Sequence, residues 1–307
     1  MFEIKSYDEI VSNPKSTIDF DHELQERITK DMDMIGSDGA LVKNTKGDIH
    51  HVHFIEKLLS TVLARLTNYV PDGGIWMNTQ RPEWNDANNA LVGNGLSMVT
   101  LYYLYRFVLF FQDIINKSTS TSFLISEELH EYFTSMFNVF CKYLDAVNDI
   151  NDNKRKSIMD ELGDLGSSYR KRIYRQSFSG NKRTLSRQEI STFLHTVLVH
   201  LQASIANNKR QDGLYHAYNI LTLTSDEAII SHLPEMLEGQ VAAISSGYVS
   251  PEETISILDS MRKGNLYRED QNSYILYPDR QLPNFIDKNI IPSEKFNSSE
   301  LLKKLIQ

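Results

Sequence analysis

The feature that most constrains this chain is a long apolar segment in its first half, over residues 91–115. Polar residues such as Arg106 and Asp113 interrupt it, so it is a poor membrane span and has to be buried against other parts of the chain. We expect a helix over about residues 87–116, apolar on nearly every face and placed inside a large core. With 307 residues, of which 41% are hydrophobic, the chain is large enough to form that core.

Apolar residues recur at spacings of three and four along most of the remaining chain, which predicts further helices. Capping residues support two of the predicted helix starts: Ser186 with Glu189 forms a capping-box pattern, and Pro251 stands at a first helical position. Strand signals are few. The sequence therefore predicts a mainly α chain of about eight helices. The further helices are expected over residues 50–69, 126–147, 154–174, 186–206, 225–246 and 250–263.

Turn residues and changes in periodicity divide the chain into three parts. Residues 1–49 are expected to form an extended and loop segment with a short helix. Residues 50–266 hold the predicted helices and form the main domain. Residues 267–307 form an irregular C-terminal tail that contains three prolines and shows little periodicity.

Charge and cysteine content narrow the function classes. The net charge of -8 argues against nucleic acid and an anionic membrane as partners, because both attract basic surfaces. The single cysteine, Cys141, allows no internal disulfide, and the N-terminus lacks the basic and apolar pattern of a secretory signal, so we expect a cytoplasmic protein. We find no phosphate-binding glycine loop and no strong metal-ligand pattern, so neither a cofactor nor a metal is expected.

Both tryptophans of the chain lie in one polar segment that is expected to be a loop, at Trp76 and Trp84. A tryptophan ring stacks on the apolar face of a sugar, while neighbouring amide and charged groups hydrogen-bond its hydroxyls. This composition predicts a saccharide site. The polar residues of the segment that would bind the sugar are Gln80, Arg81, Asn85, Asn88 and Asn89.

Two carboxylates in the same segment are candidates for acid–base chemistry. Cleavage of a glycosidic bond needs an acid that protonates the leaving oxygen and a second group on the other side of the sugar. Asp86 is the candidate acid, and Glu83 lies three residues before it. An alternative interpretation is that Asp86 only caps the helix predicted to follow.

The stretch from Trp84 to Asn89, Trp-Asn-Asp-Ala-Asn-Asn, resembles a Trp-Asn-Asp-Gly-Met-Asn motif of the cellobiose phosphorylase type of glycoside phosphorylases. The whole segment through Gly95 is also similar to larger uncharacterised bacterial relatives of those enzymes. The resemblance implies an (α/α)6 toroid, an inverting reaction, Asp86 as general acid and inorganic phosphate as a co-substrate. The predicted fold is thus an α/α-toroid-like array of antiparallel helix pairs. Fewer helices are expected here than a complete toroid needs, so a partial toroid is an alternative.

A second stretch, with Tyr215 and His216, combines aromatic, imidazole and amide groups and is a candidate to line the same site. The leading hypothesis is a glycoside hydrolase or phosphorylase-like protein acting on a glucosyl-type oligosaccharide. The alternatives are a carbohydrate-binding module without turnover and a structural fragment of a larger enzyme. The sequence leaves the sugar, the acceptor (water or phosphate) and the oligomeric state open.

Overall fold

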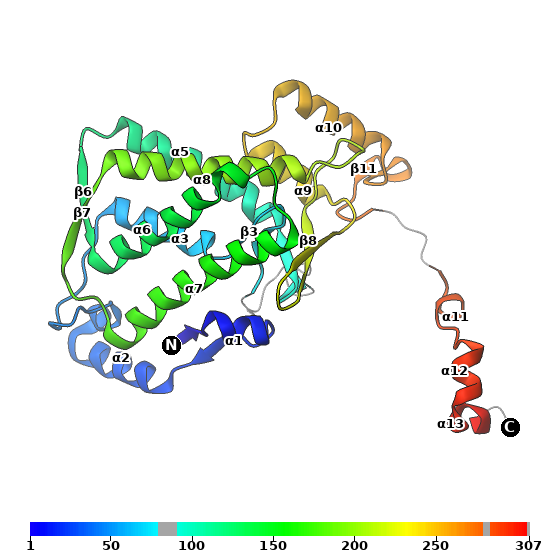
Figure 1. The fold of residues 1–307 in the computed structure, drawn as a ribbon, viewed down its shortest axis with the longest axis horizontal. Coiled ribbons are helices and arrows are strands. Elements are labelled where there is room, and N and C mark those ends of the chain that lie inside the picture. Colours follow the sequence, from blue (N-terminus) through cyan, green and yellow to red (C-terminus); the bar gives the residue numbers. More distant parts are fainter. Residues whose placement is uncertain (79–90, 279–282, 306–307) are drawn as a thin grey trace.

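The computed structural model describes residues 1–78, 91–278 and 283–305. Helices form its main layer, and in Figure 1 they run between a two-stranded ribbon at one end and a larger sheet at the other. Their apolar side chains make up most of one large buried cluster. The helices of this layer are α3 (Phe54–Leu66), α5 (Met98–Lys117), α6 (Glu127–Lys142), α7 (Asp152–Gln176) and α8 (Arg187–Asn207).

The larger sheet has five strands in the order β3-β4-β5-β8-β9, and each neighbouring pair is antiparallel. One face of it carries a second apolar cluster, which contains Tyr7 and Met159 from helices as well as strand residues. The sheet therefore belongs to the core and closes one end of the helical layer (Figure 1). Its strands are β3 (Tyr69–Val70), β4 (Gly74–Trp76), β5 (Gly95–Ser97), β8 (Tyr218–Leu223) and β9 (Ala228–His232).

The two-stranded ribbon pairs β6 (Ser122–Ser126) with β7 (Lys182–Ser186), and each strand leads directly into a helix, α6 or α8. A smaller N-terminal unit lies against α7. It consists of β1 (Phe2–Ile4), α1 (Tyr7–Ser12), β2 (Ile18–Phe20), α2 (His22–Ile35) and the 3-10 helix η1 (Gly36–Ala40).

The remaining elements follow the five-stranded sheet in the chain or are single 3-10 turns. In Figure 1 the last three helices extend away from the helical layer. These elements are η2 (Leu144–Ala146), α9 (Leu237–Ser245), α10 (Pro251–Lys263), β10 (Tyr267–Arg268), η3 (Glu269–Gln271), β11 (Ser273–Tyr274), α11 (Phe285–Lys288), α12 (Ser293–Ser298) and α13 (Glu300–Leu305).

The prediction of a mainly α, toroid-like array of helix pairs, whether complete or partial, is wrong. The chain is 57% helical and 16% strand, and its five-stranded antiparallel sheet makes it a mixed α/β protein. The physical reason is the length of the strands. Three of the five have only two or three residues, which is too short for the alternation of apolar and polar positions by which a strand is recognised.

Two helix predictions are also partly wrong. In each case, part of the predicted helix is replaced by a strand of this sheet. The helix expected over residues 225–246 is replaced in its first half by β9, and only α9 is helical. The inner helix expected over 87–116 begins at Met98 in the structure, after β5, because Ser97 caps it by accepting a hydrogen bond from the N–H of Thr100. The capping box of Ser186 and Glu189 at the start of α8 is confirmed.

Helix α5 is the only helix in the described ranges that is long and apolar enough to cross a membrane. It packs against α8 and α9, and eight of its residues, from Met98 to Ile115, are buried. These contacts bury one side of α5 in the large apolar cluster of the helical layer. The expectation of a buried inner helix in this region is therefore confirmed.

A buried guanidinium joins the sheet to the helical layer. Arg155 on α7 is 7% exposed, and its Nε donates to the carbonyl of Pro71 at 2.8 Å. Its Nη1 donates to the carbonyl of Ala228 at 2.9 Å and to Asp152, and its Nη2 lies 3.4 Å from the Asp72 carboxylate. One side chain thus holds the β3–β4 turn and the first residue of β9 on one helix.

We predict that Arg155→Met lowers the free energy of unfolding by about 3 kcal/mol, because it leaves two carbonyls and a partly buried carboxylate without their partner. Urea unfolding followed by circular dichroism measures the loss. Lys117→Met on α5 is the control, because Lys117 pairs with Asp113 at the surface. Its expected cost is below about 1 kcal/mol. Equal losses in the two variants would contradict a special role for Arg155.

Candidate functional site

Two adjacent strands hold the described residues on either side of segment 79–90. The N–H of Met77 donates to the carbonyl of Gly95 at 2.9 Å, and the N–H of Gly93 donates to the carbonyl of Met77 at 2.7 Å. These bonds continue the pairing of β4 with β5. Met77 and Gly93, which lie close to the two ends of the segment in sequence, are therefore held next to each other on the sheet.

Close approach of these two strands depends on Gly74. Its φ is +125°, a region that residues with a side chain rarely adopt. A Cβ atom at this position would also lie 2.8 Å from the carbonyl carbon of Ser97 in β5. Only glycine satisfies both requirements, so this residue fixes the strand pair from which segment 79–90 departs.

The two sides of segment 79–90 pack against the same small apolar cluster. Met77 precedes the segment and Leu91 follows it, and both contact a cluster made by Ala217, Tyr218 and Met236. Two of these three residues directly follow the aromatic stretch that the sequence marked as a second part of the site. The structure therefore brings the flanks of the two predicted stretches together.

Trp76 lies inside the protein. Its side chain is 3% exposed, packs edge-on against Tyr7 with ring centroids 6.5 Å apart, and donates from Nε1 to the carbonyl of Gly93 at 2.9 Å. The ring belongs to the apolar cluster between the sheet and helices α1 and α7. The indole thus stabilises the base from which segment 79–90 departs.

Tyr215 is also part of the core, with 1% of its surface exposed. Its ring packs edge-on against Tyr102, and its hydroxyl donates to Glu253 at 2.8 Å. Gln240 holds its backbone on both sides: Tyr215 N–H donates to Oε1 at 2.8 Å, and Nε2 donates to the Tyr215 carbonyl at 2.7 Å. This buried residue fixes the position of the next residue in the chain, His216.

His216 forms a stacked pair with His232, a residue at the end of β9. The ring centroids are 4.1 Å apart and the planes are nearly parallel, at 10°. His216 is 8% exposed, whereas His232 is exposed. His232 therefore stands at the surface and His216 is buried beneath it, next in the chain to the cluster that the flanks of segment 79–90 contact.

Two buried asparagines determine the tautomer of His232. The Nδ2 group of Asn219 donates to Asn208 Oδ1 and to the Gly73 carbonyl, both at 2.8 Å. Its Oδ1 is therefore an acceptor, and His232 Nδ1 lies 2.8 Å from it. That nitrogen has to carry the proton, which leaves Nε2 with a free lone pair.

The same argument applies to His216. Its Nδ1 lies 3.2 Å from the carbonyl of Leu233, which can only accept, so Nδ1 carries the proton here too. Neither Nε2 of the pair has a hydrogen-bond partner in the part of the chain that the structure describes. The site thus presents two neighbouring imidazole acceptors, which suit a ligand that offers hydroxyl protons.

A group of charged side chains lies next to the imidazole pair. Arg210 lies 2.8 Å from Asp212 and 3.0 Å from Glu235, so its charge is matched by two carboxylates. Glu235 is further held by Asn265, whose amide lies 3.4 Å away. These residues form a polar group of paired charges near the imidazole pair.

Both histidines are kept neutral near neutral pH. Burial, and after it the neighbouring His232 and Arg210, lower the pKa of His216 to about 4. The pKa of His232 is lowered by burial first and by Arg210 second. A neutral imidazole keeps the Nε2 lone pair that a hydroxyl donor needs.

Most of the predicted site lies outside the described residues. This holds for the candidate acid Asp86, the second carboxylate Glu83 and the candidate platform Trp84. It also holds for the predicted sugar-binding residues Gln80, Arg81, Asn85, Asn88 and Asn89. Of the predicted residues, Trp76, Tyr215 and His216 are described, and only His216, which is buried beneath the exposed His232, belongs to the imidazole pair.

Sequence reasoning missed the partners of His216. His232 fell in a stretch predicted to be helical, where nothing indicated that it would face another histidine. Arg210 and Glu235 stand far apart in the sequence and meet only through the fold. The one available signal was the stretch of aromatic, imidazole and amide residues that begins at Tyr215 and includes Asn219.

No protein-family model matches this chain, and no curated protein matches its sequence. The proposals below therefore depend on the geometry of the described residues and on the residue types of segment 79–90.

We predict that stability falls as pH drops from 6.5 to about 4, the interval between the ordinary and the folded-state pKa of His216. The unfolded chain binds the proton first in this interval, so protonation favours unfolding. The contribution of this residue is on the order of 2 kcal/mol. This contribution is fully present above pH 6.5 and is lost as the pH falls to about 4. Urea unfolding at a series of pH values measures the loss.

His216→Gln should flatten this pH dependence, because the replacement does not titrate there. His195→Gln is the control, since His195 is an exposed histidine on α8. If the His216 variant kept the full slope of the unmodified protein, the neutral, buried state assigned to His216 would be incorrect.

Proposed function

We propose that this chain is a cytoplasmic, carbohydrate-active protein that binds a glucosyl-type oligosaccharide with residues of segment 79–90 and with the imidazole pair of His216 and His232. One observation carries the proposal. Within the described residues, the Nε2 atoms of two neutral imidazoles have no hydrogen-bond partner, and the pair lies next to the apolar cluster that the flanks of the segment contact. Sugar hydroxyls are donors that match these acceptors.

In this proposal, segment 79–90 supplies the remaining contacts. Trp84 is the stacking platform, because Trp76 is enclosed in the core. Asp86 is the general acid that protonates the leaving oxygen, and Glu83 is the second carboxylate. The other sugar-binding residues are Gln80, Arg81, Asn85, Asn88 and Asn89. The motif resemblance supports an inverting reaction with water or inorganic phosphate as the acceptor.

A second candidate function is sugar binding without turnover. Asp212 and Glu235, the carboxylates beside the imidazole pair, are both paired with Arg210. Within the described ranges the site therefore offers no unpaired carboxylate to act as a base opposite Asp86. If Glu83 does not fill that role, the site binds a saccharide and leaves its bonds intact.

The first test uses thermal melts of the purified chain with a panel of disaccharides, with and without inorganic phosphate. A sugar at a hundred times its dissociation constant adds about 2.7 kcal/mol to the stability, which raises the Tm by about two degrees or more. His232→Gln should weaken that stabilisation, because it removes one Nε2 acceptor from an exposed position. His195→Gln is the matched control and should leave the sugar response unchanged.

The second test separates turnover from binding. Asp86→Asn keeps the shape and hydrogen-bonding capacity of the side chain but removes the acid, so product formation should fall by about a hundredfold or more. Binding measured by the same melts should persist. A sugar that binds without product release in the unmodified chain would favour the binding module. A sharp melt that no sugar shifts would reject both functions and return Asp86 to the role of a helix cap.

A further inference from the structure

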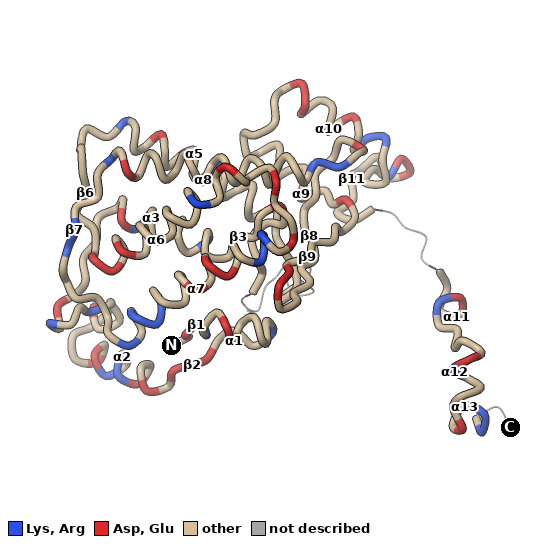
Figure 2. The backbone as a smooth tube through the Cα atoms, viewed as in Figure 1, with Lys and Arg blue, Asp and Glu red and all other residues tan. Residues whose placement is uncertain are grey.

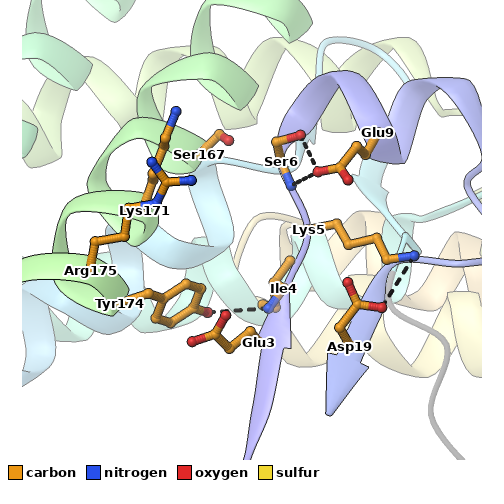
Figure 3. Close-up of a pocket in the computed structure, with 10 residues that line it drawn as sticks. All are labelled: Glu3, Ile4, Lys5, Ser6, Glu9, Asp19, Ser167, Lys171, Tyr174 and Arg175. Atoms are coloured by element: carbon orange, nitrogen blue, oxygen red, sulfur yellow. Dashed lines mark hydrogen bonds and ion pairs between the residues drawn. The ribbon is translucent and has the colours of Figure 1, made fainter. Parts of the chain in front are cut away.

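A separate pocket of about 340 Å³ lies between the N-terminal unit and helix α7. Figure 3 shows two walls: side chains of α7 on one side and residues of β1, β2 and α1 on the other. Its volume is at the lower end of the range for small-molecule sites. None of its lining residues belongs to the proposed saccharide site.

The α7 wall presents four polar side chains from one face of the helix. Ser167, Lys171, Tyr174 and Arg175 follow one another at spacings of four, three and one, so they project in similar directions. They belong to the strongly basic C-terminal end of α7 (Figure 2). This wall is therefore made of two hydroxyls and two cations.

Both hydroxyls of this wall keep a proton to donate. Ser167 Oγ accepts from the N–H of Tyr7 at 3.1 Å, and Tyr174 Oη accepts from the N–H of Ile4 at 3.3 Å. These backbone bonds fix the two oxygens but use only their lone pairs. Within the described residues neither hydroxyl proton has an acceptor.

Both cations of the wall are unpaired in the part of the chain that the structure describes, unlike Arg172 on the same helix, which binds Glu131. Lys171 and Arg175 stand four residues apart on one helix face, where like charges destabilise each other. An anion between them would remove that repulsion.

The opposite wall carries three carboxylates, those of Glu3, Glu9 and Asp19, and two of them are already engaged. Ser6 donates its N–H to Glu9 at 3.0 Å and its hydroxyl to the same carboxylate, which lowers the pKa of Glu9. Asp19 lies 3.4 Å from Lys5. Glu3 has no partner within the described residues, so the lining holds three carboxylates and three cations. Its unpaired positive charge is gathered in the α7 wall, at Lys171 and Arg175.

We propose that this pocket binds a small oxyanion of the phosphate class, either inorganic phosphate or a phosphate monoester. A tetrahedral oxyanion has only acceptors, and the α7 wall offers two charged and two neutral donors. The remaining volume beside Glu9 and Ser6 leaves room for the organic part of an ester. This site does not depend on the proposed saccharide function.

Isothermal titration with inorganic phosphate, sulfate and glycerol 2-phosphate tests the proposal, with sodium chloride at matched ionic strength as the reference. Lys171→Met and Arg175→Gln should each weaken phosphate binding about tenfold, because each removes a charge-assisted hydrogen bond. Tyr174→Phe should weaken it a few-fold while leaving the ring in place. All three side chains are exposed, so the fold should survive.

A fourth variant is expected to strengthen phosphate binding. Glu9→Gln keeps an acceptor for the N–H of Ser6 but removes a negative charge from the facing wall, so phosphate should bind about two- to fourfold more tightly. Lys57→Met and Arg106→Gln are matched controls. They remove exposed cations on α3 and α5 and should leave binding unchanged.

The comparison of ligands identifies the source of the oxyanion. Tighter binding of glycerol 2-phosphate than of inorganic phosphate would assign the pocket to an ester, and the reverse order would assign it to the free ion. Phosphate binding that the Lys171 and Arg175 variants do not weaken would overturn the proposal. So would heat signals that sodium chloride reproduces, because they would reflect general charge screening.

Discussion

The rest of the structure depends on a buried arginine that connects α7 to two separate parts of the sheet. Arg155 binds the carbonyls of Pro71 and Ala228, which stand more than 150 residues apart in the sequence. Short strands cannot form a stable sheet alone, because two or three residues supply few hydrogen bonds and little apolar surface. This joint therefore lets β3, β4 and β9 form one sheet over the helical layer.

The position of the candidate site follows from that joint. The β3–β4 turn that Arg155 holds is also bound by Asn208, whose amide donates to the carbonyl of Asp72 at 2.7 Å. Asn208 binds Asn219, and Asn219 sets the proton on His232. A continuous line of buried polar contacts thus runs from the helical layer to the surface imidazole, and each group along it is fixed by the one before.

Much of the helical layer could be predicted from the sequence, whereas the sheet could not. Helices such as α8 carry their own signals, an apolar stripe and the capping box of Ser186, and both depend on residues close in sequence. Strand β5 has three residues, and what makes it a strand is its pairing with β4 and β8. Pairing depends on distant residues, so no local pattern reveals it.

The candidate site could likewise be predicted only in part, because residue types alone do not show which side chains are buried. Two tryptophans in a polar stretch indicated a sugar platform, but the sequence could not separate an exposed indole from a buried one. Trp76 is buried because it stands on the inward side of β4, where Tyr7 and the carbonyl of Gly93 satisfy it. His216 was selected for its own chemistry, yet its chemistry depends on His232, which the fold stacks upon it. A lone histidine would titrate near neutral pH, whereas this one, buried against a second imidazole and near Arg210, keeps its Nε2 lone pair for a donor.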